Sequence, residues 1–363
     1  MDSQSLLDPV ELIYDRRIRG ALMISVADGQ HCHLHGGCWL AICGLSPARL
    51  MAAIPKEFAA AAMIQALGRF TVSVSSVDDQ AWQGRFYHGD WSVVQDPKLF
   101  VRSPAGAPVP RAAVGYVDFS LLHAVDLGDF LLVVGEACGG SLLQAAADNI
   151  TVNAIVAVAD PRGAEETVLP FAAFAYNPRA LDAAPCAAFA LSDQAFLDVF
   201  GRRHWGLYLA STVAAGRSHL MVSGWGMQAS HRPARLVVAA AASSPVGALW
   251  REPGASVLIS LLSGHDRALV QALAAGDDLA ATGGLIVRAD GLASTEGALA
   301  TFEGHATAWF EVGDMVLAEL TVDLAEDTSD QGANLMVEEV VAEVGWAGHL
   351  DPGTDQPLSA QGG

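Results

Sequence analysis

Residues 223–230 carry the side chains of this chain that are best suited to bind a ligand. The hydroxyls of Ser223 and Ser230 and the amide of Gln228 can form hydrogen bonds, and Gly224 lets backbone amides approach a ligand closely. Trp225 adds a flat apolar wall. The same residue types are also typical of a sheet core and its turns, so the segment by itself does not identify a site.

A near-copy of this segment lies 186 positions earlier in the chain. Residues 223–236 read SGWGMQASHRPARL and residues 37–50 read GCWLAICGLSPARL, so Trp39 aligns with Trp225 without a gap. The upstream pairs that also match are Arg16/Arg202, Arg17/Arg203, Gly20/Gly206, Ser25/Ser211 and His33/His219. This fixed spacing predicts that one domain has been duplicated.

The length agrees with a duplication, because 363 residues suit two domains of ordinary size better than a single core. We expect a first domain over residues 1–184, a second over residues 187–350 and a disordered tail over residues 351–363. The boundary is placed in the Ala/Pro stretch 181–186.

Most of the patterned segments read as short strands separated by turn residues. Alternation and turn signals predict helices over residues 1–15, 55–68 and 193–200. They predict strands over residues 20–26, 31–40, 50–54 and 70–76 and two more between 112 and 135. The segment 139–164 is interpreted as one extra strand pair. No G-x-G-x-x-G follows a strand, so a doubly wound nucleotide-binding domain has no support. The pattern favours a mainly β protein built from closed barrels.

The order of elements around the repeated segment resembles the entry motif of the flavin reductase-like, FMN-binding split-barrel family. That order is an apolar strand, a small and hydroxyl-rich run with an aromatic residue, Gln228-Ala229-Ser230, then Pro233 and another apolar run. The resemblance covers most of both halves. It implies two tandem split β-barrels of Greek-key type with short peripheral helices. Because family barrels usually pair as two-fold dimers, it also implies that the fused halves form an internal pseudo-dimer, in a chain that is a monomer or a homodimer.

By this resemblance the second half binds FMN. The matching positions are Ser223, Gly224, Trp225, Gln228 and Ser230 for the flavin, and Ser243 and Ser244 for the phosphate end, with Arg232 as a nearby cation. We expect the phosphate to be met by donors such as Ser230, Ser243, Ser244 and either Arg232 or Arg235, because an anion buried in a chain of net charge −20 needs charge-assisted or backbone hydrogen bonds. Arg235 is the weaker candidate, because Arg49 stands in its column in the first half.

The same columns of the first half have lost most of these donors. Gly37, Cys38, Ile42 and Gly44 stand where the second half has Ser223, Gly224, Gln228 and Ser230. We therefore expect one well-kept site, in the second half, with the first half degenerate.

The resemblance implies an NAD(P)H-dependent flavin reductase-type oxidoreductase that passes electrons to free flavin, oxygen or an electron-acceptor protein. Ser73 and Ser260 stand where the family commonly has Asn, and Phe130 and Met315 where it has His after Gly-Asp. These departures prompt two alternatives: a flavin-binding or electron-transfer protein without nicotinamide turnover, and a haem- or metal-binding split barrel.

Charge and composition exclude several other classes. The net charge is −20 and the only two lysines are Lys56 and Lys98, so nucleic acid is not an expected partner. The chain contains no apolar run of membrane-spanning length, and the acidic N-terminus does not read as a secretory signal, so we expect a cytoplasmic protein. His31, His33 and His35 have a spacing at which a strand could present a metal site, although histidines at the edge of a hairpin are the simpler explanation.

The predicted pairing of the two halves can be tested by expressing each half alone. Residues 1–184 or 187–363 should expose an apolar pairing surface and give aggregated or re-dimerised material in size-exclusion chromatography. Two soluble monomeric halves at micromolar concentration would contradict an internal pair.

Overall fold

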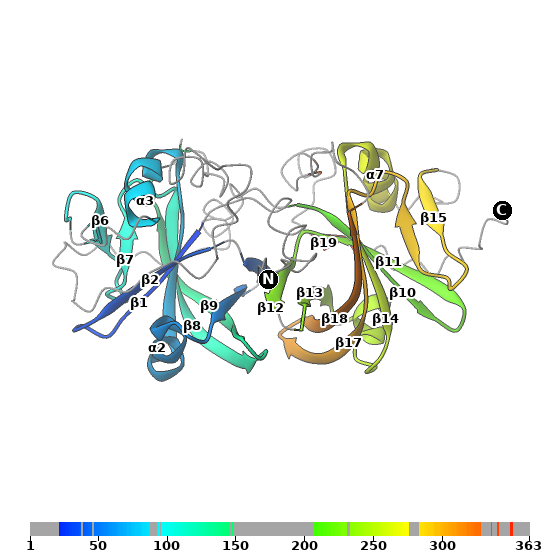
Figure 1. Ribbon diagram of the computed structural model, residues 1–363, viewed down its shortest axis with the longest axis horizontal. Coiled ribbons are helices and arrows are strands. Elements are labelled where there is room, and N and C mark those ends of the chain that lie inside the picture. Colours follow the sequence, from blue (N-terminus) through cyan, green and yellow to red (C-terminus); the bar gives the residue numbers. More distant parts are fainter. Residues whose placement is uncertain are drawn as a thin grey trace, which may run out of the picture. The chain divides into compact units, whose positions relative to one another are not determined.

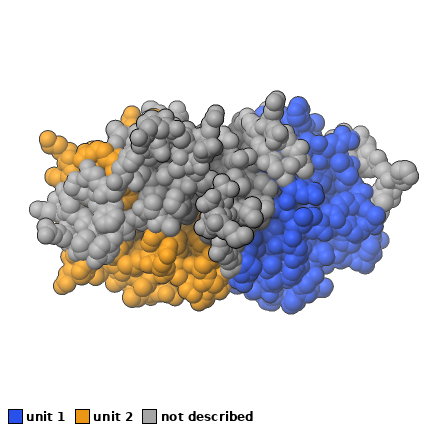
Figure 2. Space-filling view, viewed as in Figure 1, with its two compact units in different colours: residues 1–18, 205–363 blue, residues 19–204 orange. Residues whose placement is uncertain are grey.

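The computed structural model describes residues 22–144 and 206–327, with gaps at 38, 46, 88–92, 95, 231–232 and 276–282, and also residues 147, 335, 340 and 349–350. The predicted helices over 1–15 and 193–200, most of the predicted strand pair over 139–164, the boundary at 181–186 and the tail from 351 lie outside the described residues. The described residues fall into two compact units (Figure 2). Unit 2 takes in those between Arg19 and His204, and unit 1 takes in those from Trp205 onward.

Unit 2 is organised around a seven-stranded antiparallel sheet of order β2-β1-β5-β8-β9-β4-β3 (Figure 1). Its strands are β1 (Leu22–Ala27), β2 (Cys32–Gly37), β3 (Leu40–Leu45), β4 (Ala48–Pro55), β5 (Arg69–Val74), β8 (Gly115–Asp126) and β9 (Phe130–Leu142). The remaining elements are α2 (Ala59–Leu67), η1 (Val77–Asp79), α3 (Gln80–Tyr87) and a small hairpin of β6 (Phe100–Arg102) and β7 (Pro108–Pro110).

Unit 1 has an eight-stranded sheet of order β12-β13-β18-β17-β14-β10-β11-β19. Its strands are β10 (Tyr208–Ala214), β11 (Arg217–Ser223), β12 (Gly226–Ser230), β13 (Arg235–Ala241), β14 (Ser256–Leu261), β17 (Ala300–Val312), β18 (Met315–Asp327) and β19 (His349–Leu350). The remaining elements are α6 (Pro245–Leu249), η3 (Gly264–Asp266), α7 (Arg267–Ala275) and a hairpin of β15 (Leu285–Val287) and β16 (Ala293–Thr295).

The two sheets have the same strand order, apart from β19, and irregularities at matching places. The register shifts between Ile42 and Gly44 in the β3–β4 pair and between Gln228 and Ser230 in the β12–β13 pair, positions that differ by 186. In the described part of each sheet, no ladder joins the two outermost strands of the shared order. The predicted mainly β fold of two split barrels with short helices is therefore confirmed, and the matching registers agree with the predicted duplication.

Local sequence explains several element boundaries. Asp28 and Gly29 turn the chain between β1 and β2, where Gly29 has φ +91° and the Asp28 carboxylate accepts hydrogen bonds from the backbone N–H groups of His31 and Gln30. These bonds lower the pKa of Asp28 to about 2. The helix predicted before Gly68 is present, and Gly68 closes it in the left-handed conformation with φ 64°.

One predicted strand was wrong. We expected a single strand over residues 31–40, but β2 ends at Gly37 and β3 begins at Leu40. The pair Gly36-Gly37 stands where β2 ends, and such a pair is a turn signal that the prediction of one strand did not use. The pairing of β3 with β4 depends on contacts made across the sheet.

The core of unit 2 requires a glycine beneath two stacked rings. Phe70 and Phe119 stack with ring centroids 5.2 Å apart, and a Cβ atom added at Gly135 would lie 2.6 Å from the Phe70 ring and 2.8 Å from Phe119. Such contacts are far inside the van der Waals distance, so only glycine fits without moving the ring pair.

Gly135→Ala should therefore destabilise the protein by about 1–3 kcal/mol, because a methyl group inserted into a close-packed core forces its neighbours to shift. Urea denaturation followed by near-ultraviolet circular dichroism would measure the change. Gly264→Ala is the matched control, because a Cβ atom there meets nothing within 4 Å. An equal loss in both variants would contradict this account of the core.

Candidate functional site

Ser223 shapes the turn that carries Trp225. Ser223 ends β11, and its hydroxyl accepts a hydrogen bond of 2.9 Å from the backbone N–H of Trp225. The Trp225 carbonyl in turn accepts a bond of 2.8 Å from the backbone N–H of Ala239 on β13. The Trp225 side chain is 7% exposed, so it lies in the core of unit 1 rather than on an open surface.

Tyr208 is a neighbour of this turn that the sequence did not indicate. It lies opposite Ser223 in the β10–β11 ladder, and a Cβ atom added at Gly226 would lie 2.6 Å from its hydroxyl. Gly226 is thus needed for the close approach of the ring to the backbone. Burial raises the pKa of Tyr208, which keeps its hydroxyl in the neutral form.

Gln228 is the most unusual residue of the segment. Its side chain is 0% exposed, and neither its amide nitrogen nor its amide oxygen has a hydrogen-bond partner among the described residues. An amide can form up to four hydrogen bonds, and burying one without them costs about 1–3 kcal/mol. The first half avoids this cost, because its counterpart, Ile42, is apolar.

The β-bulge that follows Gln228 places Ser230 beside Arg235. Ser230 is 0% exposed and pairs with Arg235 across the β12–β13 ladder. Arg235 forms an ion pair of 2.8 Å with Glu319, much as Arg49 pairs with Glu136 at 3.0 Å in unit 2. An arginine held by a carboxylate in each unit is best explained as structural, and Arg232 lies outside the described residues.

The structure places the expected phosphate donors Ser230, Ser243 and Ser244 at opposite ends of β13. Ser230 pairs with Arg235 at the start of β13, whereas Ser243 and Ser244 follow its last residue, Ala241. Each residue of a strand adds about 3.3 Å, so the two ends of β13 lie about 20 Å apart. One phosphate cannot contact both ends.

The two serines beyond β13 also differ from each other. The Ser244 hydroxyl caps α6 by accepting a hydrogen bond of 2.9 Å from the backbone N–H of Gly247. Ser243 is exposed. The structure thus brings Ser223, Gly224, Trp225, Gln228 and Ser230 together along one turn and strand, and separates them from Ser243 and Ser244.

The histidines of unit 2 do not form a metal site in the described residues. His33 and His35 alternate along β2, and both are buried, while His31 lies in the preceding turn beside Asp28. Burial lowers the pKa of His35 to about 4. Within the described part of the chain no group of three or more His, Cys, Asp or Glu side chains could hold a metal ion, and Cys38 lies outside that part.

The fold thus defines a protein of two split-barrel units. Comparison with known families finds a match for unit 2. Residues 21–157 match the model of the flavin reductase like domain. Over these residues the chain is similar to the flavin reductase like domain. The matched residues lie in unit 2, whereas the donor-rich segment lies in unit 1.

Several solved structures resemble part of the chain. BorF, the flavin reductase component of a bacterial two-component tryptophan halogenase, is 22% identical, with 39% of this chain and 88% of that chain covered at a TM-score of 0.33. The Streptomyces globisporus C-1027 NADH:FAD oxidoreductase SgcE6 is 20% identical, with 41% and 89% covered at a TM-score of 0.34. The FMN-binding protein from Thermus thermophilus is 15% identical, with 36% and 74% covered at a TM-score of 0.31.

Comparison with curated protein sequences finds no match. Among the described helices, none is both long enough and apolar enough to cross a membrane.

The buried amide of Gln228 gives a testable prediction about the protein without ligand. Gln228→Ile, which installs the residue of the first half, should raise the thermal midpoint of the apo-protein, because an unpaired buried amide is replaced by an apolar side chain. Differential scanning fluorimetry would measure it. Ile42→Val is the control, and should lower the midpoint slightly through a lost methylene group. A lower midpoint for Gln228→Ile would mean that its amide is already bonded.

Proposed function

We propose that this chain is an FMN-binding flavoprotein, and that it works as an NAD(P)H-dependent flavin reductase-type oxidoreductase. The observation that carries the proposal is the buried, unpaired amide of Gln228 beside Trp225, in a chain whose residues 21–157 match the flavin reductase like domain. A bound flavin supplies the redox chemistry, so the protein needs only to hold and orient it.

The roles in this proposal follow from the contacts of each residue. Trp225 is the apolar wall for the ring, and the Gln228 amide donates to and accepts from its polar edge. Gly224 lets the backbone approach the ligand, whereas the space beside Gly226 is already filled by the Tyr208 ring. Ser223, which is occupied by the Trp225 backbone, positions the wall.

Binding requires covering residues to shift. Ser223, Gln228 and Ser230 are each 0% exposed, so a ligand reaches them only when neighbouring segments open. The Gln228 amide makes opening less costly, since it has no internal bond to lose and gains bonds to the ligand.

The phosphate is assigned to the Ser230 end of β13, with Arg232 as the cation. A buried hydroxyl contributes more to an anion than an exposed one such as Ser243, whose water bonds must first be broken. Ser244 is retained as a helix cap. FAD would occupy the same ring site, and the two flavins can be compared in one titration.

A further part of the proposal concerns partners. Flavin and nicotinamide nucleotides are the expected small molecules, and an electron-acceptor protein is the expected macromolecular partner that receives the reduced flavin.

The spectrum of the purified protein separates the alternatives. A yellow protein bleached rapidly by NADH or NADPH supports the reductase, whereas bleaching by dithionite alone supports a flavin-binding or electron-transfer protein without nicotinamide turnover. A Soret band would favour a haem binder, and a colourless protein that takes up no FMN would favour a scaffold or a metal binder. Either result would overturn the flavin assignment.

Three variants test which residues bind the phosphate. Ser230→Ala should weaken FMN binding roughly 10- to 150-fold, the loss of one hydrogen bond of about 1.5–3 kcal/mol to a charged group. Ser243→Ala and Gly44→Ala should stay within a few-fold; at Gly44 a Cβ atom meets its nearest neighbours at 3.4 Å, which is tolerable. Flavin fluorescence titrations measure all three. A loss confined to Ser243→Ala would move the phosphate to the other end of β13, and a loss confined to Gly44→Ala would move the site to the first half.

A further inference from the structure

Two serines occupy equivalent places on the sheets of both units. Ser25 on β1 corresponds to Ser211 on β10, 186 positions later, and Ser73 on β5 corresponds to Ser260 on β14, 187 positions later. All four side chains are 0% exposed. The repeat therefore offers an internal comparison of how one buried pair of hydroxyls is satisfied.

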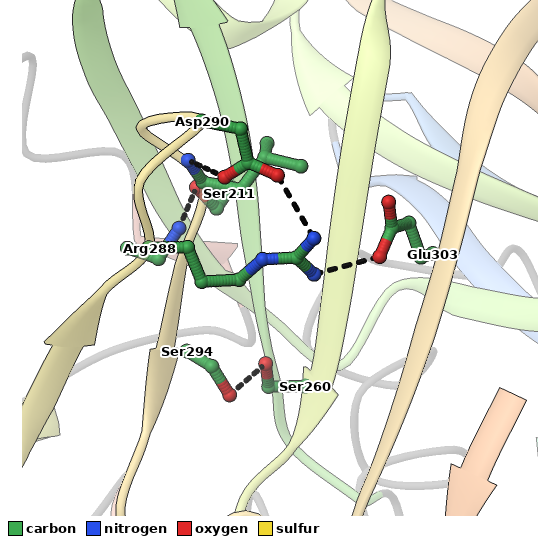
Figure 3. A network of polar contacts seen from close by, with 8 residues as sticks. Ser211, Ser260, Arg288, Asp290, Ser294 and Glu303 are labelled. Carbon is green, nitrogen blue, oxygen red and sulfur yellow. Dashed lines mark hydrogen bonds and ion pairs between the residues drawn. The ribbon is translucent and has the colours of Figure 1, made fainter. Parts of the chain in front are cut away.

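In unit 1 the β15–β16 hairpin satisfies both serines directly (Figure 3). The backbone N–H of Ala293 donates a hydrogen bond of 2.8 Å to the Ser211 hydroxyl, and the hydroxyls of Ser260 and Ser294 lie 2.8 Å apart in a shared bond. Arg288 adds ion pairs to Asp290 and Glu303 at 2.8 and 2.6 Å. The hairpin of unit 1 is fastened to its sheet without any intermediary.

In unit 2 the same two bonds are lost to substitution. Pro108 stands where Ala293 stands, and proline has no N–H to donate, while Val109 stands where Ser294 stands and has no hydroxyl. The hydroxyls of Ser25 and Ser73 accordingly have no hydrogen-bond partner among the described residues.

A third polar group has been added in the same layer. Gln83 on α3 replaces Val270 on α7, is 0% exposed, and has neither amide atom bonded to a described residue. Compared with unit 1, unit 2 therefore lacks two groups that bond the serines and has one more buried amide without a partner among the described residues. Such groups are rarely left unsatisfied in folded proteins.

Register places Ser25 and Ser73 on one face of the sheet, and the repeat relates Gln83 to a residue that packs with the hairpin of unit 1. Ser25 faces Thr71 and Met23 faces Ser73 in the β1–β5 ladder, so the two serines are diagonal neighbours on one face, about 7 Å apart. In unit 1, Val270 packs in one hydrophobic cluster with Ala293, whose N–H bonds Ser211. Gln83 holds the position of Val270 in the repeat, and from this correspondence we infer that it lies on the Pro108 side of the sheet.

The occupant of this layer must be neutral. The nearest carboxylate on the same face, Asp118, already accepts a hydrogen bond from Thr71, and Asp79 accepts bonds from the Trp82 ring and from the Ser76 backbone. Burial raises the pKa of Asp79, the residue before α3, to about 6. A hydroxyl pair at this separation suits a molecule that forms bonds of about 2.8 Å on each side.

We propose that unit 2 encloses ordered water bound to Ser25, Ser73 and Gln83, and that this water replaces the direct bonds by which unit 1 fastens its hairpin. Water is a neutral donor and acceptor of the right size, and buried waters typically make about three hydrogen bonds to groups that are otherwise unsatisfied. In unit 2 the hydroxyls of Thr71 on β5 and Ser103 in the turn of the β6–β7 hairpin still join sheet and hairpin directly at 3.2 Å, so the water replaces only the two bonds that Ser211 and Ser260 receive in unit 1.

Crystal structures of the full chain and of two variants, at a resolution that shows ordered water, test the proposal. The wild type should show water about 2.7–3.2 Å from the Gln83 amide and from at least one of the two serines. Gln83→Val, which installs the residue of unit 1, should lose the water at the amide. Pro108→Ala combined with Val109→Ser should displace the water at Ser25 and Ser73 through direct bonds like those of unit 1.

Thermal midpoints provide a second readout. If water satisfies the amide, Gln83→Val should leave the midpoint unchanged or lower it. Val270→Gln is the matched control and should lower the midpoint, because both serines of unit 1 are already bonded to the hairpin. Direct bonds among the three side chains, density larger than water, or a dry layer together with a rise of several degrees for Gln83→Val would each overturn the proposal.

Discussion

The long antiparallel hairpin in each unit is the constraint on which the remainder of its sheet depends. Strands β8 and β9 have 12 and 13 residues and β17 and β18 have 13 each, and every other strand of the shared order joins on one side or the other. The hairpins are interrupted at matching places, beginning at Asp118 in one unit and Glu303 in the other. Bulges increase local twist and bend a strand, so repeating them at the same places curls both sheets alike and brings β4 and β13 to equivalent positions beside them.

Within that common frame, buried polar groups decide how the units differ. Cross-strand position determines which face a side chain occupies, and one backbone N–H or hydroxyl on the covering hairpin determines whether it is satisfied. Pro108 in place of Ala293 changes no strand, yet it removes the donor that Ser211 uses in unit 1. A duplicated domain can in this way keep its fold and change the chemistry of its interior through single residues.

The contrast between a shared fold and a few differing residues also applies to the proposed ligand site. The family match lies over residues 21–157, whereas the hydroxyl and amide donors of the proposed ligand site lie in the second half. A family model weighs the whole pattern of a domain, while binding depends on a few donors. The first half can therefore retain the family pattern with Ile42 and Gly44 in the positions where the second half retains Gln228 and Ser230.

The sequence by itself determined the mainly β class, most strands and the turns at Asp28-Gly29 and Gly68, because alternation and turn chemistry are local properties. It also indicated the repeat, with which the matching strand orders agree. Only the tertiary structure decided that Tyr208 approaches Gly226 and that β13 separates Ser230 from Ser244. These features depend on the register between strands that are distant in the chain, and a shift of one residue would turn every side chain to the opposite face.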